Sequence, residues 1–527
     1  MKTLIGLVGF AVRAAALGAF GAVLLPTTIS AAPAAPATMA PMPGMTMAPM
    51  PGMTMAPAKP AARATATPSA KPATPATATP TVSPAEVPAA VPSPAPAGSM
   101  DGMKMDGPPA GGMSTDAMHS TTDIADPMSQ DGSGTAWVPK STQMFGWMRM
   151  GARDMQMTHG AIFPRYVSAG SQRGSRRADA PNWLMFMGTH ALGERAQFGY
   201  TAMLSADTLT ENQTGYPLLF QTGESAYGMQ LHDRQHPHDL FSELAVTYST
   251  RLGAASSAYV YLGYPGEPAL GPTAFMHRRI AYDMPDSTIG HHWQDASHIQ
   301  FGVATLGFAP AANVKIEAST FTGREPNEVR TNFDRIHLDS YSTRLSWNPN
   351  DNVSTEVSYA FIKSPEALDP LTNQHRLVGS LLYNKPLGVD RNLYAGFVVG
   401  QNIESGGGRT SSYLAEADYQ MGANTAYARL EAGTRTARDL VIPNVDPATV
   451  YSVGAYTFGG VHDLTRNPAA LNVGLGAQFT LGSKAAGLDA LYGSGTPLGY
   501  EVFLRIRPPD LAHTMNAMAG MTGGTKR

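Results

Sequence analysis

The chain of 527 residues has 37 Lys and Arg against 40 Asp and Glu, which gives a formal net charge of −3. A nucleic-acid-binding protein would need a basic surplus, so no nucleic-acid partner is expected. The sequence contains no Cys, which excludes disulfide bonds, thiolate metal sites and lipid attachment at an N-terminal cysteine. Only 15% of the residues are charged, a low share for a soluble globular protein.

The N-terminus has the pattern of a secretory signal peptide. A short region with basic residues at Lys2 and Arg13 comes first, and the apolar residues 14–25 that follow are too few to cross a membrane as a helix. Small residues around Ala31 suit cleavage, so residues 1–31 are predicted to be removed after export. The alternative is a retained anchor helix, but Arg13 interrupts its apolar stretch.

Residues 32–143 are predicted to form a long disordered leader. They consist largely of Ala, Pro, Thr, Ser and Gly, with almost no branched aliphatic or aromatic side chains. Burial of so few apolar groups could not offset the entropy lost on ordering the chain.

Methionines recur within this leader. The eight residues from Ala40 to Met47 are repeated from Ala48 to Met55, and a second group of Met alternates with Asp. Thioether sulfurs close together on a flexible chain can converge on one soft ion such as Cu(I) or Ag(I). The alternative is a low-complexity linker whose Met content is incidental. The candidate ligands in the leader are Met42, Met45, Met47, Met50, Met53, Met55, Met100, Met103, Met105 and His119.

From about Met144 the sequence alternates between apolar and polar residues. Val357 and Tyr359 share one face of a predicted strand, and Glu356 and Ser358 take the other. Charged side chains recur on the polar face, as expected if this face lines a water-filled lumen. Sequences typical of turns separate the predicted strands. These features favour an all-β fold, a transmembrane antiparallel β-barrel, over a soluble β-sandwich.

The barrel is predicted to span residues 144–508, followed by a flexible Met-containing tail at 509–527. About sixteen strands are expected, with a range of roughly 14–18 because each strand's signal is weak. A barrel of that size leaves room for an aqueous lumen. The predicted starts lie near Met155, Trp183, Gln197, Leu240, Ala258, His298, Val314, Tyr341, Val353, His375, Leu393, Tyr413, Thr425, Tyr451, Leu471 and Tyr500.

Two His-rich inserts, residues 205–239 and 265–297, interrupt the strands. In an extended chain His232, Arg234, His236 and His238 would share a face. Imidazoles at this spacing can hold Cu(II), Zn(II) or Ni(II), with Asp as an oxygen ligand or orienting partner. The candidate metal ligands in the inserts are His232, His236, His238, His277, His291 and His292.

For these inserts we favour a polar plug without metal over a metal site. Loops folded into a wide barrel need hydrogen bonds, which His, Arg, Asp and Gln supply. A lumenal charge network is favoured by Arg278, Arg279, Arg324, Arg330 and Glu267. Pro237 also argues against a regular central strand.

No catalytic constellation stands out, because the sequence has neither a Gly-x-Ser-x-Gly elbow nor a phosphate-binding loop. A Ser and His pair in an outer-membrane enzyme is formally possible, but no residue is singled out. We therefore predict a protein that is not an enzyme.

Several motifs resemble those of a family of largely uncharacterised bacterial outer-membrane proteins. The resemblance covers about residues 144–508 and implies the outer membrane and a β-barrel, with no agreed activity. The Met-rich leader separately resembles leaders of copper-resistance outer-membrane proteins, which implies a copper ion. The motifs are His232-Asp233-Arg234-Gln235-His236-Pro237-His238-Asp239-Leu240-Phe241, Pro265-Gly266-Glu267-Pro268-Ala269, Phe275-Met276-His277-Arg278, His291-His292-Trp293, Gly323-Arg324-Glu325-Pro326 and Lys363-Ser364-Pro365-Glu366.

The sequence thus predicts a barrel in contact with outer-membrane lipid that handles metal ions, with copper first, through binding, efflux or tolerance. The alternative is a general porin for small solutes with a passive leader. An outer-membrane enzyme is a third, weaker hypothesis. The oligomeric state and the direction of transport are not predicted.

Overall fold

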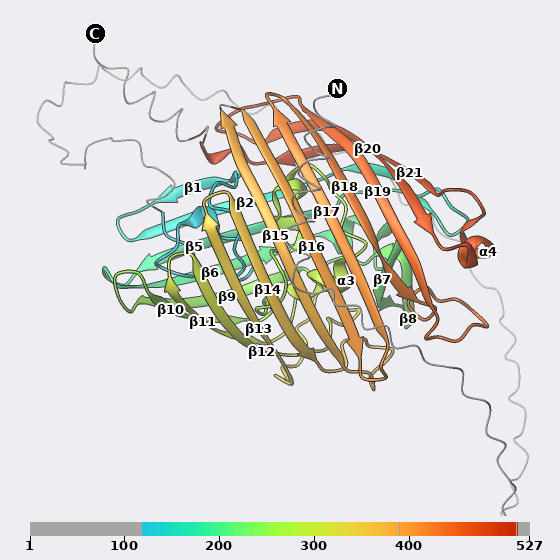
Figure 1. Ribbon diagram of the computed structural model, residues 1–527. Coiled ribbons are helices and arrows are strands. Elements are labelled where there is room, and N and C mark those ends of the chain that lie inside the picture. Colours follow the sequence, from blue (N-terminus) through green and yellow to red (C-terminus); the bar gives the residue numbers. More distant parts are fainter. Residues whose placement is uncertain (1–117, 389, 513, 515–527) are drawn as a thin grey trace, which may run out of the picture. The chain divides into compact units, whose positions relative to one another are not determined.

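The computed structural model describes residues 118–388, 390–512 and 514, and within them the dominant element is a closed antiparallel β-barrel (Figure 1). The main sheet holds 19 strands, and sixteen form the wall when the short side strands β1 (Trp147–Met150), β3 (Arg165–Ser168) and β4 (Arg176–Asp179) are set aside. The wall strands are β2 (Asp154–Ile162), β5 (Asn182–Ala191), β6 (Ala196–Leu204), β9 (Phe241–Arg251), β10 (Ser257–Gly263), β11 (Val303–Ala311), β12 (Val314–Phe321), β13 (Ser340–Asn350), β14 (Val353–Ile362), β15 (Gln374–Gly388), β16 (Arg391–Glu404), β17 (Arg409–Met421), β18 (Asn424–Thr436), β19 (Val450–Asp463), β20 (Asn472–Lys484) and β21 (Leu498–Arg507).

The last strand closes the barrel against the first. β21 pairs with β2 at Ile506 and Ile162, and with β3 over the register that sets Val502 opposite Tyr166. The predicted all-β barrel of about sixteen strands is therefore confirmed. The predicted strand starts lie close to the observed ones, and the largest displacement is at His298, where β11 begins instead at Val303.

The remaining elements are not part of the wall. The first insert carries a separate two-stranded hairpin, β7 (Tyr216–Ala226) with β8 (Met229–Gln235). None of the helices in the described residues is long and apolar enough to span a membrane. The helices are η2 (Met128–Gln130), α2 (Asp207–Thr210), η3 (Phe275–His277), η4 (Arg279–Tyr282), α3 (His291–Gln294), η5 (Ala296–His298), η6 (Ala486–Leu488) and α4 (Asp489–Tyr492).

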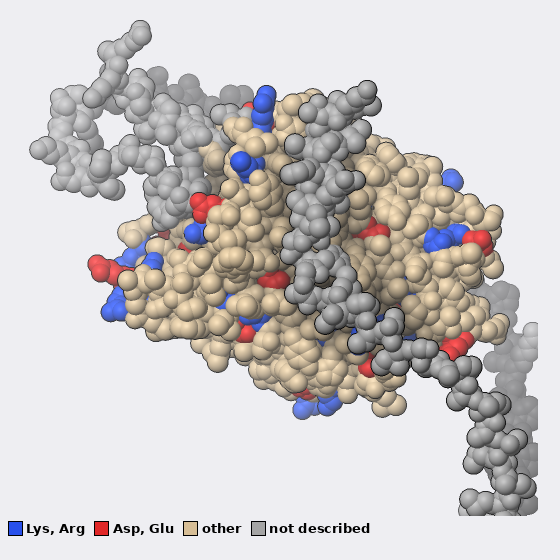
Figure 2. Space-filling view, in the orientation of Figure 1, with Lys and Arg blue, Asp and Glu red and all other residues tan. Residues whose placement is uncertain are grey.

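The wall has an apolar outside and a polar inside. In β13, Leu345 and Trp347 are exposed, whereas Ser342, Arg344 and Ser346 are buried. This period of two follows from the pleat of a strand, which points successive side chains to opposite faces. Uncharged residues cover most of the strand surface drawn in Figure 2, and few charged side chains interrupt it. The outer face suits lipid, and the inner face suits water and polar segments.

The sidedness of β14 gives a test of the lipid-facing wall. Val357 lies near the middle of the strand and is 56% exposed, while Glu356 points inward. We expect Val357→Arg to lower the free energy of unfolding by about 2–4 kcal/mol, because a charge at the bilayer midplane loses its hydration. Glu356→Gln should change it little. Urea titration of the barrel in lipid vesicles measures both, and equal losses would contradict the assignment of the two faces.

The two ends of the barrel differ in the length of their connections. At one end the turns are short, such as 312–313, 351–352 and 422–423. The opposite end carries both inserts and the loops 322–339 and 363–373. Barrels of bacterial outer membranes have short periplasmic turns and long extracellular loops, so the inserts enter from the outer mouth.

Residues 118–143 fill part of the lumen, and we call them the N-terminal plug. Ser257 in β10 donates a hydrogen bond to Asp123 (2.6 Å), and Arg344 in β13 donates one to Thr135 (2.8 Å). At its end, the backbone of Ser141 bonds that of Asp351 in a short turn. The prediction of a disordered leader is wrong for this part, because polar contacts with the lumen wall order the segment where apolar burial could not. Residues 32–117 lie outside the described part of the chain.

The second insert meets the N-terminal plug inside the barrel. Its residues are buried almost throughout, and the backbone N–H of Ala274 donates to the Ser133 hydroxyl (2.7 Å). The lumen is thus filled from both mouths. The segment after β21 is also partly ordered, since Gly146 bonds Pro509 and Leu511 is buried. The predicted flexible tail therefore cannot begin before residue 512.

Candidate functional site

The two inserts bring histidines together in the lumen. We call His236, His238, His291, His292 and His298 the imidazole cluster. The ring centres of His236 and His292 lie 5.7 Å apart, and those of His291 and His292 lie 5.4 Å apart. His298 is 5.1 Å from His291 and 5.5 Å from His238. All five side chains are buried.

Each ring of the imidazole cluster is held by its Nδ1 atom. Nδ1 of His238 lies 2.6 Å from Asp207, that of His291 lies 2.7 Å from Asp295, and that of His298 lies 2.9 Å from the Asp295 carbonyl oxygen. In contrast, the Nε2 atoms of all five rings are buried without a hydrogen-bond partner among the described residues. In a histidine that binds a metal, one ring nitrogen is usually oriented by a hydrogen bond, and the other nitrogen is free to bind the ion.

Local structure explains how His236 and His238 reach this place. β8 ends at Gln235, directly before His236 and Pro237, because proline cannot donate to a strand ladder. His232 and Arg234 lie within β8, whereas His236 and His238 lie beyond its end, so the four residues do not share one strand face. Beyond the strand end the chain turns inward and buries His236 and His238.

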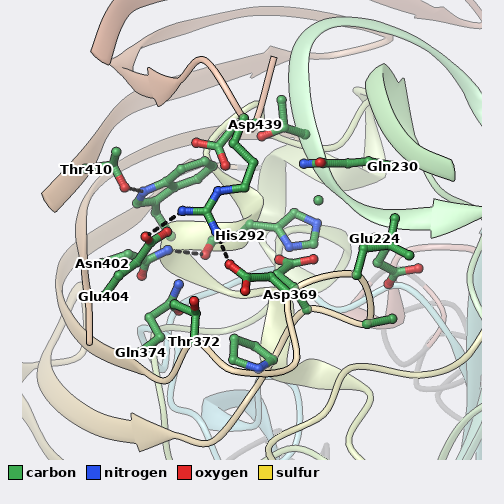
Figure 3. A pocket seen from close by; sticks show the side chains of 18 of the residues that line it. Glu224, Gln230, His292, Asp369, Thr372, Gln374, Asn402, Glu404, Thr410 and Asp439 are labelled. Carbon is green, nitrogen blue, oxygen red and sulfur yellow. Dashed lines mark hydrogen bonds and ion pairs between the residues drawn. The ribbon is translucent and has the colours of Figure 1, made fainter. Parts of the chain in front are cut away.

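One member of the cluster, His292, borders a small hollow of about 80 Å³ at the outer mouth, shown in Figure 3. His292 lies in the middle of this view, between Glu224 on β7 and Asn402 on β16. His292 lies on α3. A hydrogen bond to β16 fixes it there, because the Asn402 side-chain amide donates to the His292 carbonyl oxygen (2.9 Å). Carboxylates outnumber guanidinium groups among the lining residues, which include Glu224, Glu366, Asp369, Glu404 and Asp439 against Arg376 and Arg438.

Two loops bring carboxylates to His292. One ligand atom each from His292, Glu325 and Glu366 lie within 4.8 Å of one another, and we call these residues the His–Glu–Glu triad. The loops are joined beside the triad, since the backbone N–H of Glu325 donates to the Pro365 carbonyl (3.1 Å). His292 Nδ1 lies 3.2 Å from Glu325 Oε1.

The charges of the triad depend on one another. Burial opposes protonation of His292, but Glu325, and less strongly Glu366, outweigh it and raise the pKa of this imidazole. Burial, followed by the neighbouring charge of Glu325, raises the pKa of Glu366 to about 8. Glu366 thus keeps its proton up to higher pH than an ordinary carboxyl, and a bound cation would displace that proton.

The sequence singled out His292 as a ligand but missed Glu325 and Glu366. Both carboxylates lie in motifs that carry the resemblance described above, Gly323-Arg324-Glu325-Pro326 and Lys363-Ser364-Pro365-Glu366. The motifs were therefore a usable signal, because the structure brings them to the same place as His291-His292-Trp293.

The other predicted ligands lie apart from the imidazole cluster. His232 is half-buried and contacts Asp233 (2.9 Å). His277 packs against Trp183 and lies 3.4 Å from the sulfur of Met203. His119 is exposed and forms a bridge with Pro127. The leader methionines lie outside the described residues: Met42, Met45, Met47, Met50, Met53, Met55, Met100, Met103 and Met105.

The lumenal charge network predicted from the sequence is present around Arg278, Arg279 and Arg330. Arg278 bonds Glu416 (2.7 Å) and Asp295 (2.6 Å), and Arg279 bonds Asp283 (2.6 Å). Arg330 pairs with Glu224. The network and the imidazole cluster occupy the same inserts, so the two hypotheses for these residues do not exclude each other.

A closed barrel of sixteen strands with a lipid-facing outside and a polar, filled lumen defines a transmembrane β-barrel of the bacterial outer membrane. No protein-family model matches the sequence, and no curated protein matches it either.

Solved structures that resemble this chain include outer-membrane channels. An anion-selective porin from Comamonas acidovorans shows 13% identity over 67% of this chain and 99% of its own, with a TM-score of 0.42. OmpF of Salmonella typhi, in complex with daunomycin, shows 11% identity over 68% and 100%, with a TM-score of 0.43. The channel DcaP of Acinetobacter baumannii shows 8% identity over 69% and 100%, with a TM-score of 0.38.

Proposed function

We propose that the protein is an outer-membrane channel for small hydrophilic solutes, whose passage is restricted by the N-terminal plug and the second insert. The observation that carries this proposal is the polar inner wall of a closed sixteen-stranded barrel. Barrels of this strand number are wide enough for an aqueous channel. This is the general-porin alternative predicted from the sequence, with a lumen that the N-terminal plug and the second insert fill.

Hollows at both mouths support a path that the plug interrupts. At the short-turn end, a hollow of about 340 Å³ is lined by the charged residues Asp463, Arg466, Arg505 and Arg507. The smaller hollow beside His292 lies at the outer mouth. Between them, the contact of Ala274 with Ser133 joins the two lumenal segments.

The charge of the outer hollow favours cations. Its carboxylates outnumber its guanidinium groups, and acidic rings select cations in channels. We therefore expect the current through the protein in a KCl gradient to reverse at a potential nearer that of K⁺ than that of Cl⁻. Asp439→Asn should move the reversal potential toward that of Cl⁻, and a reversal potential unchanged by this substitution would contradict the role of the outer hollow.

Deletion of residues 118–139 tests whether the N-terminal plug restricts passage through the barrel. We expect the single-channel conductance in planar bilayers to rise severalfold, because the deletion removes polar contents from the lumen while leaving β1 and the wall intact. The control is deletion of residues 32–117, which should leave conductance unchanged if the leader is passive. Heat-modifiable migration on gels checks that each barrel is folded. A folded deletion variant that passes no current would rule out the channel.

Copper handling by the leader is a narrower proposal that no described residue supports, since the leader methionines lie before residue 118. Its support is the Met repeat and the affinity of thioether sulfur for Cu(I).

A further inference from the structure

We propose that the His–Glu–Glu triad of His292, Glu325 and Glu366 binds a divalent transition-metal ion of the Zn²⁺ class at the outer mouth. This inference goes beyond conduction and does not depend on it. It concerns a site formed by α3 and the two loops 322–339 and 363–373.

The first argument is geometric. Three ligand atoms within 4.8 Å of one another surround a position that one ion can occupy, with metal–ligand distances of about 2.0–2.2 Å after a small contraction. One imidazole with two carboxylates is a donor set that Zn²⁺ and neighbouring first-row ions accept. The ligand atoms need to move only a little because the two loops are already joined by the hydrogen bond between Glu325 and Pro365.

The second argument concerns unused polar atoms. Nε2 of His292 and Oε2 of Glu325 are both buried and have no hydrogen-bond partner among the described residues. Buried polar groups in folded proteins are almost always paired, so each of these atoms has the capacity to accept a partner such as a metal ion. Both atoms belong to the triad.

The third argument concerns how closely His292 is held. Gly223 on β7 packs against its ring, and a Cβ atom at this glycine would lie 2.4 Å from the ring atom Cε1. The hydrogen bond from Asn402 fixes the backbone on the other side. A ligand held between the β7 hairpin and wall strand β16 loses little freedom on binding, which favours affinity.

The imidazole cluster indicates a transition metal rather than Ca²⁺ or Mg²⁺. The rings of His236 and His291 lie 5.7 Å and 5.4 Å from that of His292, and their Nε2 atoms are also buried and unpaired. Nitrogen donors suit Zn²⁺, Ni²⁺ and Cu²⁺, whereas Ca²⁺ and Mg²⁺ prefer oxygen alone. Glu224 adds a further carboxylate, already paired with Arg330.

Zinc titration of the full chain tests the proposal. The purified protein in detergent is stripped with EDTA, exchanged into buffer and titrated with Zn²⁺ by calorimetry. We expect one site per chain that Glu325→Gln and Glu366→Gln each weaken by more than about tenfold, since each removes an anionic ligand. The matched control is Asp369→Asn, in the same hollow but outside the triad, which should leave zinc affinity unchanged.

Two further measurements separate the alternatives. Cu²⁺ bound to the triad should show the coupling of one imidazole nitrogen in its electron paramagnetic resonance spectrum, and His292→Asn should remove that coupling. Ca²⁺ should bind at least about tenfold more weakly than Zn²⁺. Equal affinities for Ca²⁺ and Zn²⁺ would mean that the acidic hollow binds divalent cations without selecting a transition metal. Zinc binding that survives both Glu variants but is lost in His298→Asn would place the ion in the imidazole cluster and overturn the triad. Absence of stoichiometric zinc would overturn the site altogether.

Discussion

Replacing Arg278 with methionine should lower the free energy of unfolding by about 3–5 kcal/mol, the usual cost of leaving buried charges without their partner. The Arg278 side chain is fully buried and bonds Glu416 (2.7 Å) and Asp295 (2.6 Å). It also donates to the Thr273 carbonyl (3.2 Å). It therefore ties the second insert to β17, and its loss leaves two carboxylates in the lumen without this counter-charge.

The matched control for Arg278 is Arg438, which also bridges two carboxylates, Asp369 and Glu404. Its side chain is 35% exposed, so water screens both pairs. Arg438→Met should change stability by no more than about 1 kcal/mol. Urea titrations of both variants in vesicles measure the difference. Similar losses would mean that the Arg278 contacts are hydrated rather than buried.

Asp283→Asn should cost a comparable amount, about 3–5 kcal/mol. This carboxylate of the second insert bonds Arg279 (2.6 Å) and Arg505, and Arg507 lies 3.6 Å away. Asparagine keeps the shape but removes the charge that holds three guanidinium groups together. The substitution therefore tests charge without opening a cavity. Lys484, whose partner Asp489 is 43% exposed, offers a weak pair for comparison, and Asp489→Asn should be nearly neutral.

Asp283 also predicts a pH dependence. Burial alone would raise its pKa, but Arg507, Arg505 and Arg279 outweigh burial and hold the pKa well below the usual range of a carboxyl. A folded pKa below the unfolded value of about 3.9 stabilises the protein above that pH, and the contribution is lost as pH falls further. Stability of the native chain measured from pH 6 to pH 2 should therefore fall toward that of Asp283→Asn. A constant difference between them would contradict this role.

The wall could be predicted from sequence because its signal is local. Alternation in β13 and β14 is visible within a few residues, and it sets Leu345 and Val357 outward without reference to any other strand. Hydrogen bonds between neighbouring strands then complete the sheet. A lipid exterior and a wet interior impose the same period of two on every strand.

The N-terminal plug could not be predicted in this way. Asp123, Gln130 and Ser133 belong to a stretch whose composition is that of a linker, yet all three are buried. Composition identifies disorder by the lack of apolar groups to bury. Inside a polar lumen the segment is ordered by hydrogen bonds with the wall, and those partners lie more than a hundred residues away along the chain.

Only part of the candidate site could be predicted, because its residues come from segments that are far apart in the sequence. Histidines are rare enough to be noticed in a sequence, so His236, His238, His291 and His292 were singled out. Glu325 and Glu366 give no such signal in the sequence, because Glu is common and the two residues lie in separate loops. Only the three-dimensional arrangement shows that they share one position with His292.

The filled lumen has a consequence for how the barrel is made. β21 is the last wall strand in the chain and pairs with the first, so the cylinder closes late in assembly. The N-terminal plug and the second insert meet at Ser133 and Ala274, and each contacts wall strands far away in sequence. Contacts of such long separation form slowly, because loop closure precedes the gain in energy. A chain whose interior is not yet assembled therefore leaves wall strands such as β10 and β17 without the lumenal partners that they have in the finished barrel.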